Sequence, residues 1–266
     1  MQVAGKVVVV TGGASGIGRA LCRRFAAEKA RAVYVADLDA QGAAAVVKEL
    51  ISAGTRATAE VCDVRAEAQV AAVARRALDE EGRIDLFCSN AGVAASGGVE
   101  VPDEVWQRTW EANVMAHVHA ARAVLPGMLA RGEGYLLQTA SAAGLLTSLA
   151  AAPYAVTKHA AVALAEWLSI TYGARGIRVS CLCPQGVHTN MLFGGLEDRA
   201  TRAVLASGPV ITPEEVAEAT IAGLAAERFL ILPHKEVATY LDHKLRDYER
   251  WLAGMRKLEA RLPKQA

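Results

Sequence analysis

The sequence has almost no net charge and few aromatic residues. Its 29 Lys and Arg side chains nearly cancel its 28 Asp and Glu side chains, which leaves a formal net charge of +1. Without a basic excess, the chain lacks the attraction that holds nucleic acid or an anionic membrane surface, so neither is expected as a partner. Aromatic residues supply only 5% of a chain that is 53% hydrophobic. The apolar content therefore comes largely from alanine, which suits closely packed helices and strands.

Long hydrophobic runs and a leader segment are also missing. The longest apolar runs, 7–10 and 140–152, are too short or too interrupted by Gly, Ser and Thr to span a membrane, which takes ~20 residues. The first ten residues, MQVAGKVVVV, have neither a basic n-region nor a cleavage site. We therefore expect a cytoplasmic protein without a secretory signal or a membrane span.

Metal-binding and disulfide patterns are absent as well. The five cysteines are an odd, scattered set, namely Cys22, Cys62, Cys88, Cys181 and Cys183. Cys181 and Cys183 share one side of an expected strand, but no second pair accompanies them, so buried reduced thiols are the preferred interpretation. His117 and His119 stand two apart on an expected helix and cannot share an ion. No metal site is expected.

Short β-branched runs alternate with longer alanine-rich helical stretches along the chain. The expected strands are Lys6–Thr11, Ala32–Ala36, Ala57–Cys62, Ile84–Ser89, Tyr135–Thr139, Ile177–Cys183 and Phe229–Leu232. The expected helices between them are Gly16–Lys29, Gln41–Ala53, Glu67–Glu81, Glu104–Arg131, Tyr154–Ala174 and Pro213–Ala226. Apolar strands separated by helices indicate a parallel sheet that is covered on both faces. We predict one α/β domain over residues 1–266, a Rossmann-type doubly wound parallel sheet of about seven strands flanked by helices.

Residues 234–266 are expected to form a helical C-terminal extension. After Pro233, one amphipathic helix is predicted from Glu236 to Leu262, because apolar residues recur at steps of three and four. They are Val237, Tyr240, Leu241, Leu245, Tyr248, Leu252 and Met255. This apolar stripe needs a cover. The extension could pack on its own subunit, close a substrate cleft or cross to a partner subunit.

A glycine-rich loop joins the first expected strand to the first expected helix. Glycines at positions 12, 16 and 18 allow a tight turn and a close approach of the backbone to a pyrophosphate. The following helix N-terminus offers free N–H groups to the phosphates. We expect this loop to bind a dinucleotide through Gly12, Ser15, Gly16, Ile17 and Gly18.

Asp37, at the end of the second expected strand, indicates which dinucleotide is bound. Its carboxylate can accept hydrogen bonds from the ribose hydroxyls of NAD and would repel the additional phosphate of NADP. Its neighbours Leu38 and Ser15 carry no compensating positive charge, and Arg19 lies one turn into the helix. NAD is therefore the expected cofactor.

These motifs, taken with several others in the same order, resemble the short-chain dehydrogenase/reductase family. Residues 11–18, TGGASGIG, match the family's TGxxxGxG loop, and Asn90–Ala91–Gly92 match its NAG element. Cys62, Asp63 and Val64 resemble the segment that contacts the adenine. The catalytic tetrad of the family is matched by Asn113, Ser141, Tyr154 and Lys158. The resemblance covers about residues 5–190 and implies hydride transfer at an alcohol or ketone carbon.

The chemistry of hydride transfer explains these residue types. A tyrosine has a pKa of about 10 and is a weak base at neutral pH unless nearby positive charge stabilises its phenolate. Lys158 follows Tyr154 by one helical turn, and oxidised nicotinamide adds a further positive charge, so Tyr154 is the expected acid/base. The resemblance implies that Lys158 also binds the nicotinamide ribose, that Ser141 holds the substrate oxygen and that Asn113 supports a water-linked proton path.

The segment after the sixth expected strand departs from the family pattern. Relatives have Pro-Gly here, whereas this chain has Pro184–Gln185. Pro184, Val187 and Thr189 remain in register with the cofactor-binding residues of the family. Two interpretations of Gln185 stay open, because it could simply tolerate the backbone conformation or project into the substrate pocket. His188 is a candidate for the pocket mouth.

Three segments are expected to surround the nicotinamide and select the substrate, namely Val93–Val99, Ala142–Ala152 and Val187–Leu196. They are small or apolar and contain no Lys or Arg, so the expected substrate is a fairly apolar secondary alcohol or its ketone. An NADPH-dependent carbonyl reductase and an NAD-sensing protein without turnover are the alternatives. The resemblance also implies a homodimer or homotetramer formed through the helices Glu104–Arg131 and Tyr154–Ala174.

Overall fold

The computed structural model describes residues 1–194 and 198–262, and its centre is one parallel sheet of seven strands. The strands lie in the order β3-β2-β1-β4-β5-β6-β7, so the chain reverses direction across the sheet between β1 and β4. Their bounds are β1 Val7–Thr11, β2 Ala32–Asp37, β3 Arg56–Val61, β4 Leu86–Ser89, β5 Gly134–Thr139, β6 Ile177–Leu182 and β7 Leu230–Ile231. The predicted doubly wound parallel sheet is confirmed.

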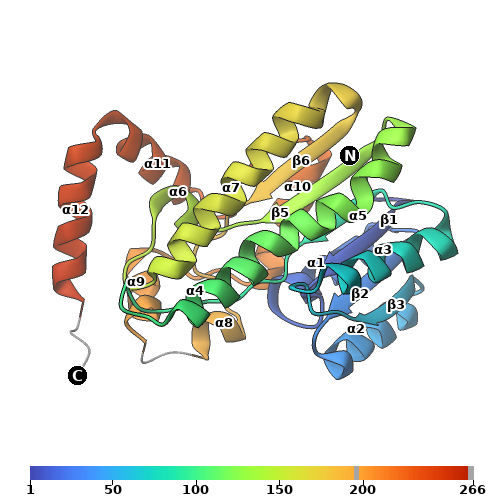
Figure 1. Ribbon diagram of the computed structural model, residues 1–266, viewed down its shortest axis with the longest axis horizontal. Coiled ribbons are helices and arrows are strands. Elements are labelled where there is room, and N and C mark those ends of the chain that lie inside the picture. The colour runs from blue at the N-terminus through green and yellow to red at the C-terminus, as the bar shows by residue number, and fades with distance from the viewer. Residues whose placement is uncertain (195–197, 263–266) are drawn as a thin grey trace.

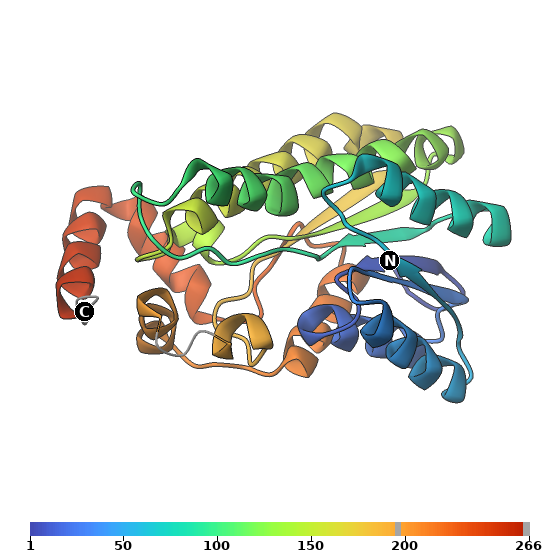
Figure 2. The ribbon, with the colours of Figure 1, turned by 60° about the horizontal axis from the view of Figure 1, so that its bottom comes forward.

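Two layers of helices enclose the sheet (Figure 1, Figure 2). Helices α3 (Glu67–Glu81), α5 (Ala116–Arg131) and α7 (Ala152–Tyr172) cover one face. Helices α1 (Gly16–Ala27), α2 (Ala40–Ser52) and α10 (Pro213–Ala225) cover the other. The remaining helices are α4 Asp103–Trp110, α6 Ala143–Leu146, α8 Asn190–Phe193, α9 Arg199–Ser207, α11 Glu236–Arg246 and α12 Tyr248–Arg261.

Strand β1 shows how the sequence builds both cores at once. Successive side chains of a strand point to opposite faces, so Val7 and Val9 join the core under α3, α5 and α7, whereas Val8 and Val10 join the core under α1, α2 and α10. All four valines are fully buried. The edge strand β3 differs from the expectation of burial on both faces, because its residues are half-buried or exposed.

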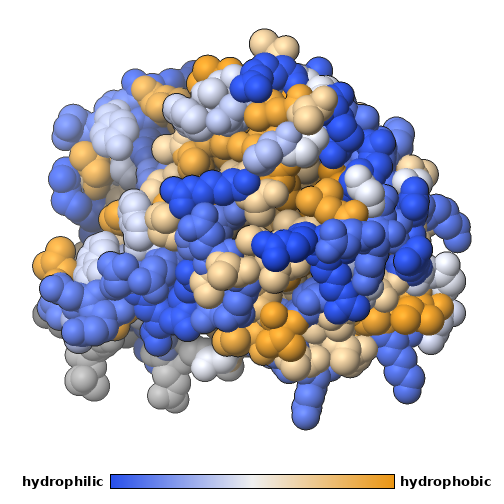
Figure 3. All heavy atoms as spheres, turned by 45° about the vertical axis from the view of Figure 1, so that its right-hand side comes forward, coloured by the Kyte–Doolittle hydropathy of each residue, from blue (hydrophilic) through white to orange (hydrophobic). Residues whose placement is uncertain are grey.

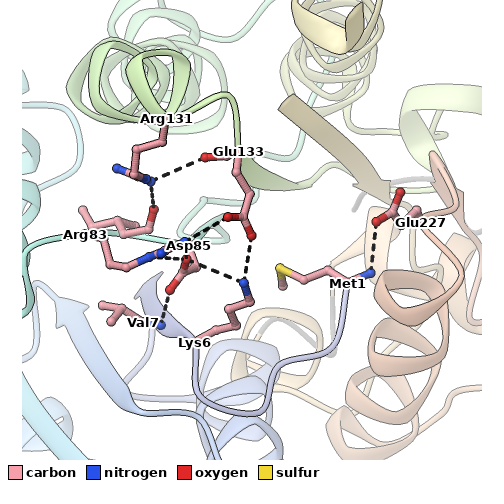
Figure 4. A network of polar contacts seen from close by, with 9 residues as sticks. Met1, Lys6, Val7, Arg83, Asp85, Arg131, Glu133 and Glu227 are labelled. Atoms are coloured by element: carbon pink, nitrogen blue, oxygen red, sulfur yellow. Dashed lines mark hydrogen bonds and ion pairs between the residues drawn. The ribbon is translucent and has the colours of Figure 1, made fainter. Parts of the chain in front are cut away.

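A charged network closes the amino ends of the central strands (Figure 4). The backbone N–H of Val7 and the side chain of Arg83 both donate to the buried carboxylate of Asp85, at 2.8 Å and 2.7 Å. Lys6 pairs with Glu133 at 2.8 Å, and Arg131 donates to the carbonyl of Ile84. This network fastens β1, β4 and β5 at one end and leaves their carboxyl ends for the site.

The helical run predicted as Glu104–Arg131 is interrupted. It begins at Asp103, with Pro102 as the N-cap residue. Between α4 and α5 the segment η1, Glu111–Met115, winds as a π-helix. A π segment inside an α-helix is rare and often marks a functional position, and this one contains Asn113.

The C-terminal extension is also interrupted, so the prediction of one helix from 236 to 262 is wrong. Asp247 has extended backbone angles, and its side chain accepts a hydrogen bond from the N–H of Arg250 at 2.9 Å, which begins the new helix α12. Aspartate favours such capping positions over helix interiors. The predicted apolar stripe is therefore divided between two helices, and Leu245 is exposed. In Figure 1, α12 stands to one side of the molecule, beyond α6 and α9.

The surface mixes polar and apolar side chains. On the face shown in Figure 3, groups of hydrophobic side chains lie between hydrophilic ones. Among the described residues, no helix combines the length and hydropathy that crossing a membrane requires.

Candidate active site

A cleft of about 1,520 Å³ lies at the carboxyl ends of the central strands. In a doubly wound sheet, the reversal of strand order leaves a crevice at this end, where ligands bind. Residues from all three predicted substrate segments line the cleft, including Val93, Leu146 and Met191. The last predicted segment, 187–196, extends into residues 195–196, which lie outside the described residues.

Every predicted cofactor-binding residue lines this one cleft. They come from β1 and α1, from the ends of β2 and β3, from the segment after β4, from α7 and from the segment after β6. They are Gly12, Ser15, Gly16, Ile17, Gly18, Asp37, Asp63, Val64, Asn90, Ala91, Gly92, Tyr154, Lys158, Pro184, Val187 and Thr189. The predicted catalytic residue Ser141 lines it as well, whereas Asn113 does not.

The glycine loop is closely packed where it faces the cleft. Gly12 has a φ of +67°, and a Cβ there would lie 2.8 Å from the Cα of Ala91. A Cβ on Gly18 would lie 1.9 Å from the carbonyl oxygen of Gly12. The first position needs glycine for its backbone conformation, and the second needs it for contact between loop and helix. The loop therefore brings backbone rather than side chains to the cleft, which fits a pyrophosphate group.

The segment after β4 is fixed to this loop through Thr11. The Thr11 hydroxyl oxygen accepts hydrogen bonds from the N–H groups of Asn90 and Ala91, at 3.0 Å and 3.2 Å. The Asn90 amide donates back to the carbonyl of Thr11 at 3.1 Å. Thr11 was not among the predicted site residues, although it directly precedes the glycine loop in sequence.

Asp37 is held in place by backbone donors. The N–H groups of Ala14 and Asp39 donate to its two carboxylate oxygens, at 2.9 Å and 3.0 Å. Arg19, the basic residue closest to the glycine loop in sequence, turns away and pairs with Glu49 on α2. Among the described residues, no Lys or Arg pairs with this carboxylate, which suits ribose hydroxyls better than a phosphate.

Asp63 is also fixed, but by a cation. The guanidinium of Arg65 donates to both carboxylate oxygens, at 2.6 Å for the closest pair, and this contact holds the pKa of Asp63 below its usual range. The backbone N–H of Asp63 donates to Gln69 at 2.8 Å. Asp63 and Val64 line the end of the cleft that would receive an adenine.

Ser141 and Tyr154 lie together where β5 ends and α7 begins. The Ser141 hydroxyl donates to the carbonyl of Pro184 at 3.3 Å and accepts from the N–H of Ala143 at 3.1 Å. Burial raises the pKa of Tyr154, and a hydrogen bond with Ser141 partly offsets this rise. Burial thus outweighs the hydrogen bond from Ser141, and the joint effect expected of Lys158 and oxidised nicotinamide on the phenolate stays a prediction.

Lys158 is buried one helical turn beyond Tyr154. Its ammonium lies 5.7 Å from the centre of the Tyr154 ring and donates to the carbonyl of Thr139 at 3.0 Å. Burial lowers its pKa to about 8. The group is therefore charged at neutral pH, close to its titration point and beside the phenol.

Asn113 lies behind the cleft, in the π segment. Its side chain accepts from the N–H of Val93 at 2.8 Å and donates to the carbonyl of Val93 at 3.0 Å. It also donates to the hydroxyl of Thr157 at 3.1 Å. A Cβ on Gly92 would lie 2.8 Å from the Asn113 side-chain oxygen and 3.5 Å from the Lys158 ammonium. Asn113 thus ties a cleft segment to α7, directly beside Lys158.

Gln185 is among the residues that line the cleft, which favours the second interpretation of this position. Its side-chain amide donates to the hydroxyl of Ser207 on α9 at 2.7 Å, and its Oε1 atom is buried without a hydrogen-bond partner. Its backbone N–H donates to Nδ1 of His234 at 3.1 Å, and Nε2 of His234 meets the carbonyl of Gly186 at 3.0 Å. Ser207 and His234 were missed because they approach only in the folded chain.

Three further histidines, His117, His119 and His188, do not line the cleft. His188 is exposed, packs on the ring of Phe193 and does not line the cleft, so its predicted place at the pocket mouth is wrong. His117 bonds Gln138, and burial together with the Lys158 charge lowers its pKa to about 3, which keeps its imidazole neutral. His119 instead meets the carbonyl of Val64, so the two histidines face different partners, as predicted.

The cysteines follow the prediction from strand geometry. Cys181 and Cys183 point to the same side of the strand, and their sulfur atoms are 3.7 Å apart, within hydrogen-bond distance and not joined as a disulfide. All five cysteines are buried and free. Burial raises the pKa of Cys62 to about 11, so this thiol stays protonated at neutral pH.

The C-terminal extension contributes residues to the same cleft, which favours the role of closing a substrate cleft, while a crossing to a partner subunit stays a prediction. Its lining residues lie on α11 and on one face of α12. They are Tyr240, His243, Arg246, Asp247, Arg250, Trp251, Gly254, Met255 and Leu258. The three predicted substrate segments contain no Lys or Arg, but the extension adds Arg246 and Arg250 to the lining of the cleft. The spacing of the α12 residues would have identified this face, but the sequence does not show that it meets the cleft.

Comparisons with known proteins agree with this arrangement. A family model described as short chain dehydrogenase matches residues 6–199. The chain is 36% identical over 257 residues to a 1-deoxy-11-beta-hydroxypentalenate dehydrogenase of Streptomyces avermitilis, which covers 95% of this chain and 93% of that protein. It is 31% identical over 226 residues to 3beta-hydroxysteroid dehydrogenase 2 of Eggerthella lenta, over 82% of this chain and 86% of that protein.

Solved structures give the same result. The structure of a short chain dehydrogenase/reductase from Burkholderia phymatum in complex with NAD has a TM-score of 0.86 and 31% identity, over 94% of this chain and 96% of that one. A 7 alpha-hydroxysteroid dehydrogenase complexed with NADH and 7-oxo glycochenodeoxycholic acid has a TM-score of 0.80 and 27% identity, over 87% of this chain and 93% of that one.

Proposed function

Because the chain belongs to the short-chain dehydrogenase/reductase family, we propose that it is an NAD-dependent oxidoreductase that interconverts a secondary alcohol and its ketone. The observation that carries this proposal is the meeting of Ser141, Tyr154 and Lys158 beside the glycine loop, in a single cleft. Each of these side chains has a chemical task there that its surroundings support.

The nicotinamide, when bound, supplies the hydride acceptor or donor and, in its oxidised form, a positive charge near the phenol. Tyr154 gives a proton to the substrate oxygen or takes one from it, because its phenol lines the cleft and can act as a general acid or base. Ser141 would turn its single O–H from the Pro184 carbonyl to the substrate oxygen, while its Oγ atom keeps accepting from the N–H of Ala143. Lys158 holds an ammonium next to Tyr154 and favours its ionised form.

The preference for NAD is supported by Asp37, which lines the cleft and pairs with no Lys or Arg in the part of the chain that the structure describes. The two structural relatives described above were solved with NAD or NADH. The glycine loop and the backbone donors that fix Asp37 would hold the adenosine half of the dinucleotide. A substrate with a largely apolar skeleton is supported by the apolar lining of the segment between β5 and α7, including Ala142, Leu146 and Leu149. The relatives named for hydroxypentalenate and hydroxysteroids support the same class.

A panel of secondary alcohols and ketones, followed through NADH absorbance with NAD and with NADP, tests the proposal. We expect turnover of bulky apolar alcohols and a clear preference for NAD. Tyr154→Phe should lower turnover by about 100- to 10,000-fold, the usual contribution of a general acid/base, while NADH binding persists.

Tyr172→Phe, at the opposite end of α7, is the matched control and should leave turnover unchanged. Preference for NADP would favour the carbonyl reductase alternative. Binding of NAD without turnover of any compound in the panel would favour the sensing protein, and normal activity of Tyr154→Phe would exclude the proposed mechanism.

A further inference from the structure

The inner face of α12 is a continuous strip of side chains along the cleft. Five of its residues and the N-cap residue Asp247 line the cleft, and their spacings of three and one place them on one side of the helix. They are Asp247, Arg250, Trp251, Gly254, Met255 and Leu258. The strip is mostly apolar, and its polar members cluster at the amino-terminal end of α12. It belongs to the same cleft as Tyr154 but to a different wall.

The wall is fastened to substrate-side elements at both ends. At one end, the ammonium of Lys244 donates to the carbonyl of Leu145 in α6 at 2.6 Å and lies 4.8 Å from the centre of the Trp251 ring. At the other end, Arg199 of α9 pairs with Glu259 of α12 at 2.6 Å. The strip therefore has a defined position opposite the loops that surround the reacting end of the cleft.

Most charges along this wall already have partners. Asp247 is used as the cap of α12, and Arg246 pairs with Asp242 at 2.8 Å. On the facing wall, the carboxylate of Asp198 accepts from Ser96 and from the N–H of Ala200. Among the described residues, no hydrogen bond or ion pair engages the guanidinium of Arg250. It is an exposed, uncompensated cation on a lining face.

The space beside Arg250 is open. Gly254 follows one helical turn later on the same face, and a Cβ built there would meet nothing within 4 Å. A glycine inside a helix costs roughly 0.5–1 kcal/mol relative to alanine, and no packing contact requires it here. The indole of Trp251 adjoins this space and offers an apolar surface to a rigid ligand.

We propose that Arg250 binds a carboxylate at the end of the substrate remote from the reacting carbon, so that the substrate class is a rigid, apolar hydroxy or keto acid. A guanidinium matches a carboxylate with two parallel hydrogen bonds. The apolar cleft between α6, α9 and Trp251 receives the skeleton, and the reacting oxygen reaches Ser141 and Tyr154. This inference rests on the proposed function because the remote end is defined relative to that catalytic group.

Binding measured apart from turnover tests the inference. The full-length protein saturated with NAD is titrated calorimetrically with a ketosteroid that carries a side-chain carboxylic acid, and separately with its methyl ester. A ketone with oxidised cofactor has no hydride donor, so neither probe reacts. Wild-type protein should bind the acid at least tenfold more tightly than the ester, and added salt should reduce this preference.

Arg250→Gln should weaken binding of the acid about tenfold and leave the ester unaffected, whereas Arg250→Lys should recover part of the preference. Arg256→Gln is the matched control, since Arg256 lies on α12 but does not line the cleft. Equal binding of acid and ester by the wild type, binding of neither probe, or a preference that survives Arg250→Gln would overturn the inference. The alcohol panel decides the proposed function separately, because neutral alcohols can be oxidised whether or not Arg250 selects an acid.

Discussion

Lys158 illustrates how a single residue can serve chemistry at the expense of stability. Its ammonium is buried, and burial lowers its pKa from 10.5 to about 8. Below pH 8 the folded protein holds this buried charge, while the unfolded chain holds the same charge in water. A shift of this size corresponds to about 3 kcal/mol. The hydrogen bond to Thr139 offsets only part of this cost.

We therefore expect Lys158→Met to abolish turnover and yet to raise the free energy of unfolding at pH 7 by about 1–3 kcal/mol. Between pH 8 and 10.5 the folded wild type loses its proton before the unfolded chain does, so the burial penalty falls and the advantage of the variant shrinks. Urea denaturation at pH 7 and pH 9.5 measures both effects.

Lys257→Met, at an exposed position of α12, is the control and should change stability little at either pH. A Lys158→Met protein that is less stable than the wild type at pH 7 would show that the Thr139 contact outweighs the desolvation of the ammonium.

One residue, Lys244, helps to hold the whole C-terminal extension against the body of the protein. Helices α11 and α12 reach the body of the protein partly through Lys244, whose ammonium binds the Leu145 carbonyl and lies over the rings of Tyr248 and Trp251. Cations over aromatic rings contribute about 0.5–2 kcal/mol depending on burial. Lys244 is buried, so this contact belongs toward the upper part of that range.

Lys244→Met should loosen the extension without unfolding the sheet. We expect faster amide hydrogen exchange in residues 236–262, unchanged exchange in β1, β4 and β5, and a KM for bulky alcohols raised several-fold with kcat little altered. Lys235→Met, at an exposed position just before α11, serves as the comparison. Unchanged exchange in α12 would mean that the Arg199–Glu259 pair holds the extension by itself.

Features specified by residues that are neighbours in the chain could be predicted from the sequence. Features that depend on contacts between distant segments could not. The valines of β1, the glycine loop and Asp37 follow one another in the chain, so their order alone indicated a dinucleotide fold. The capping box at the start of α10 is equally local, because Thr212 and Glu215 stand three residues apart. The break at Asp247 was missed because the apolar period continues across it, and the contacts of Gln185 with Ser207 and of Arg250 with the cleft join segments that are distant in sequence.

At the scale of the whole molecule, an exposed apolar strip runs along α7. Val156, Trp167 and Ile170 lie on one side of this helix, and Ile170 is 82% exposed. Large apolar side chains grouped on a surface indicate an interaction site. We propose that this strip contributes to a homodimer or homotetramer, in keeping with the helices that the family resemblance suggested.

Ile170→Asp should shift the molecular mass measured by light scattering from that of an oligomer toward that of a monomer, because a carboxylate would be buried unpaired in the interface. Leu245→Asp, which changes a similarly exposed apolar residue on the extension, should leave the mass unchanged. A monomeric wild type, or a mass that Leu245→Asp alters and Ile170→Asp does not, would place self-association elsewhere.

The C-terminal extension that lines the cleft lies outside the stretch of chain that matches the family model. The family match ends at residue 199, and the wall begins at α11, Glu236–Arg246. One wall of the cleft is therefore encoded apart from the catalytic groups and from the three substrate segments, and it meets them only after folding. Such a division allows the tail to accumulate changes that redirect the enzyme to new compounds, while the catalytic half keeps the sequence on which every turnover depends.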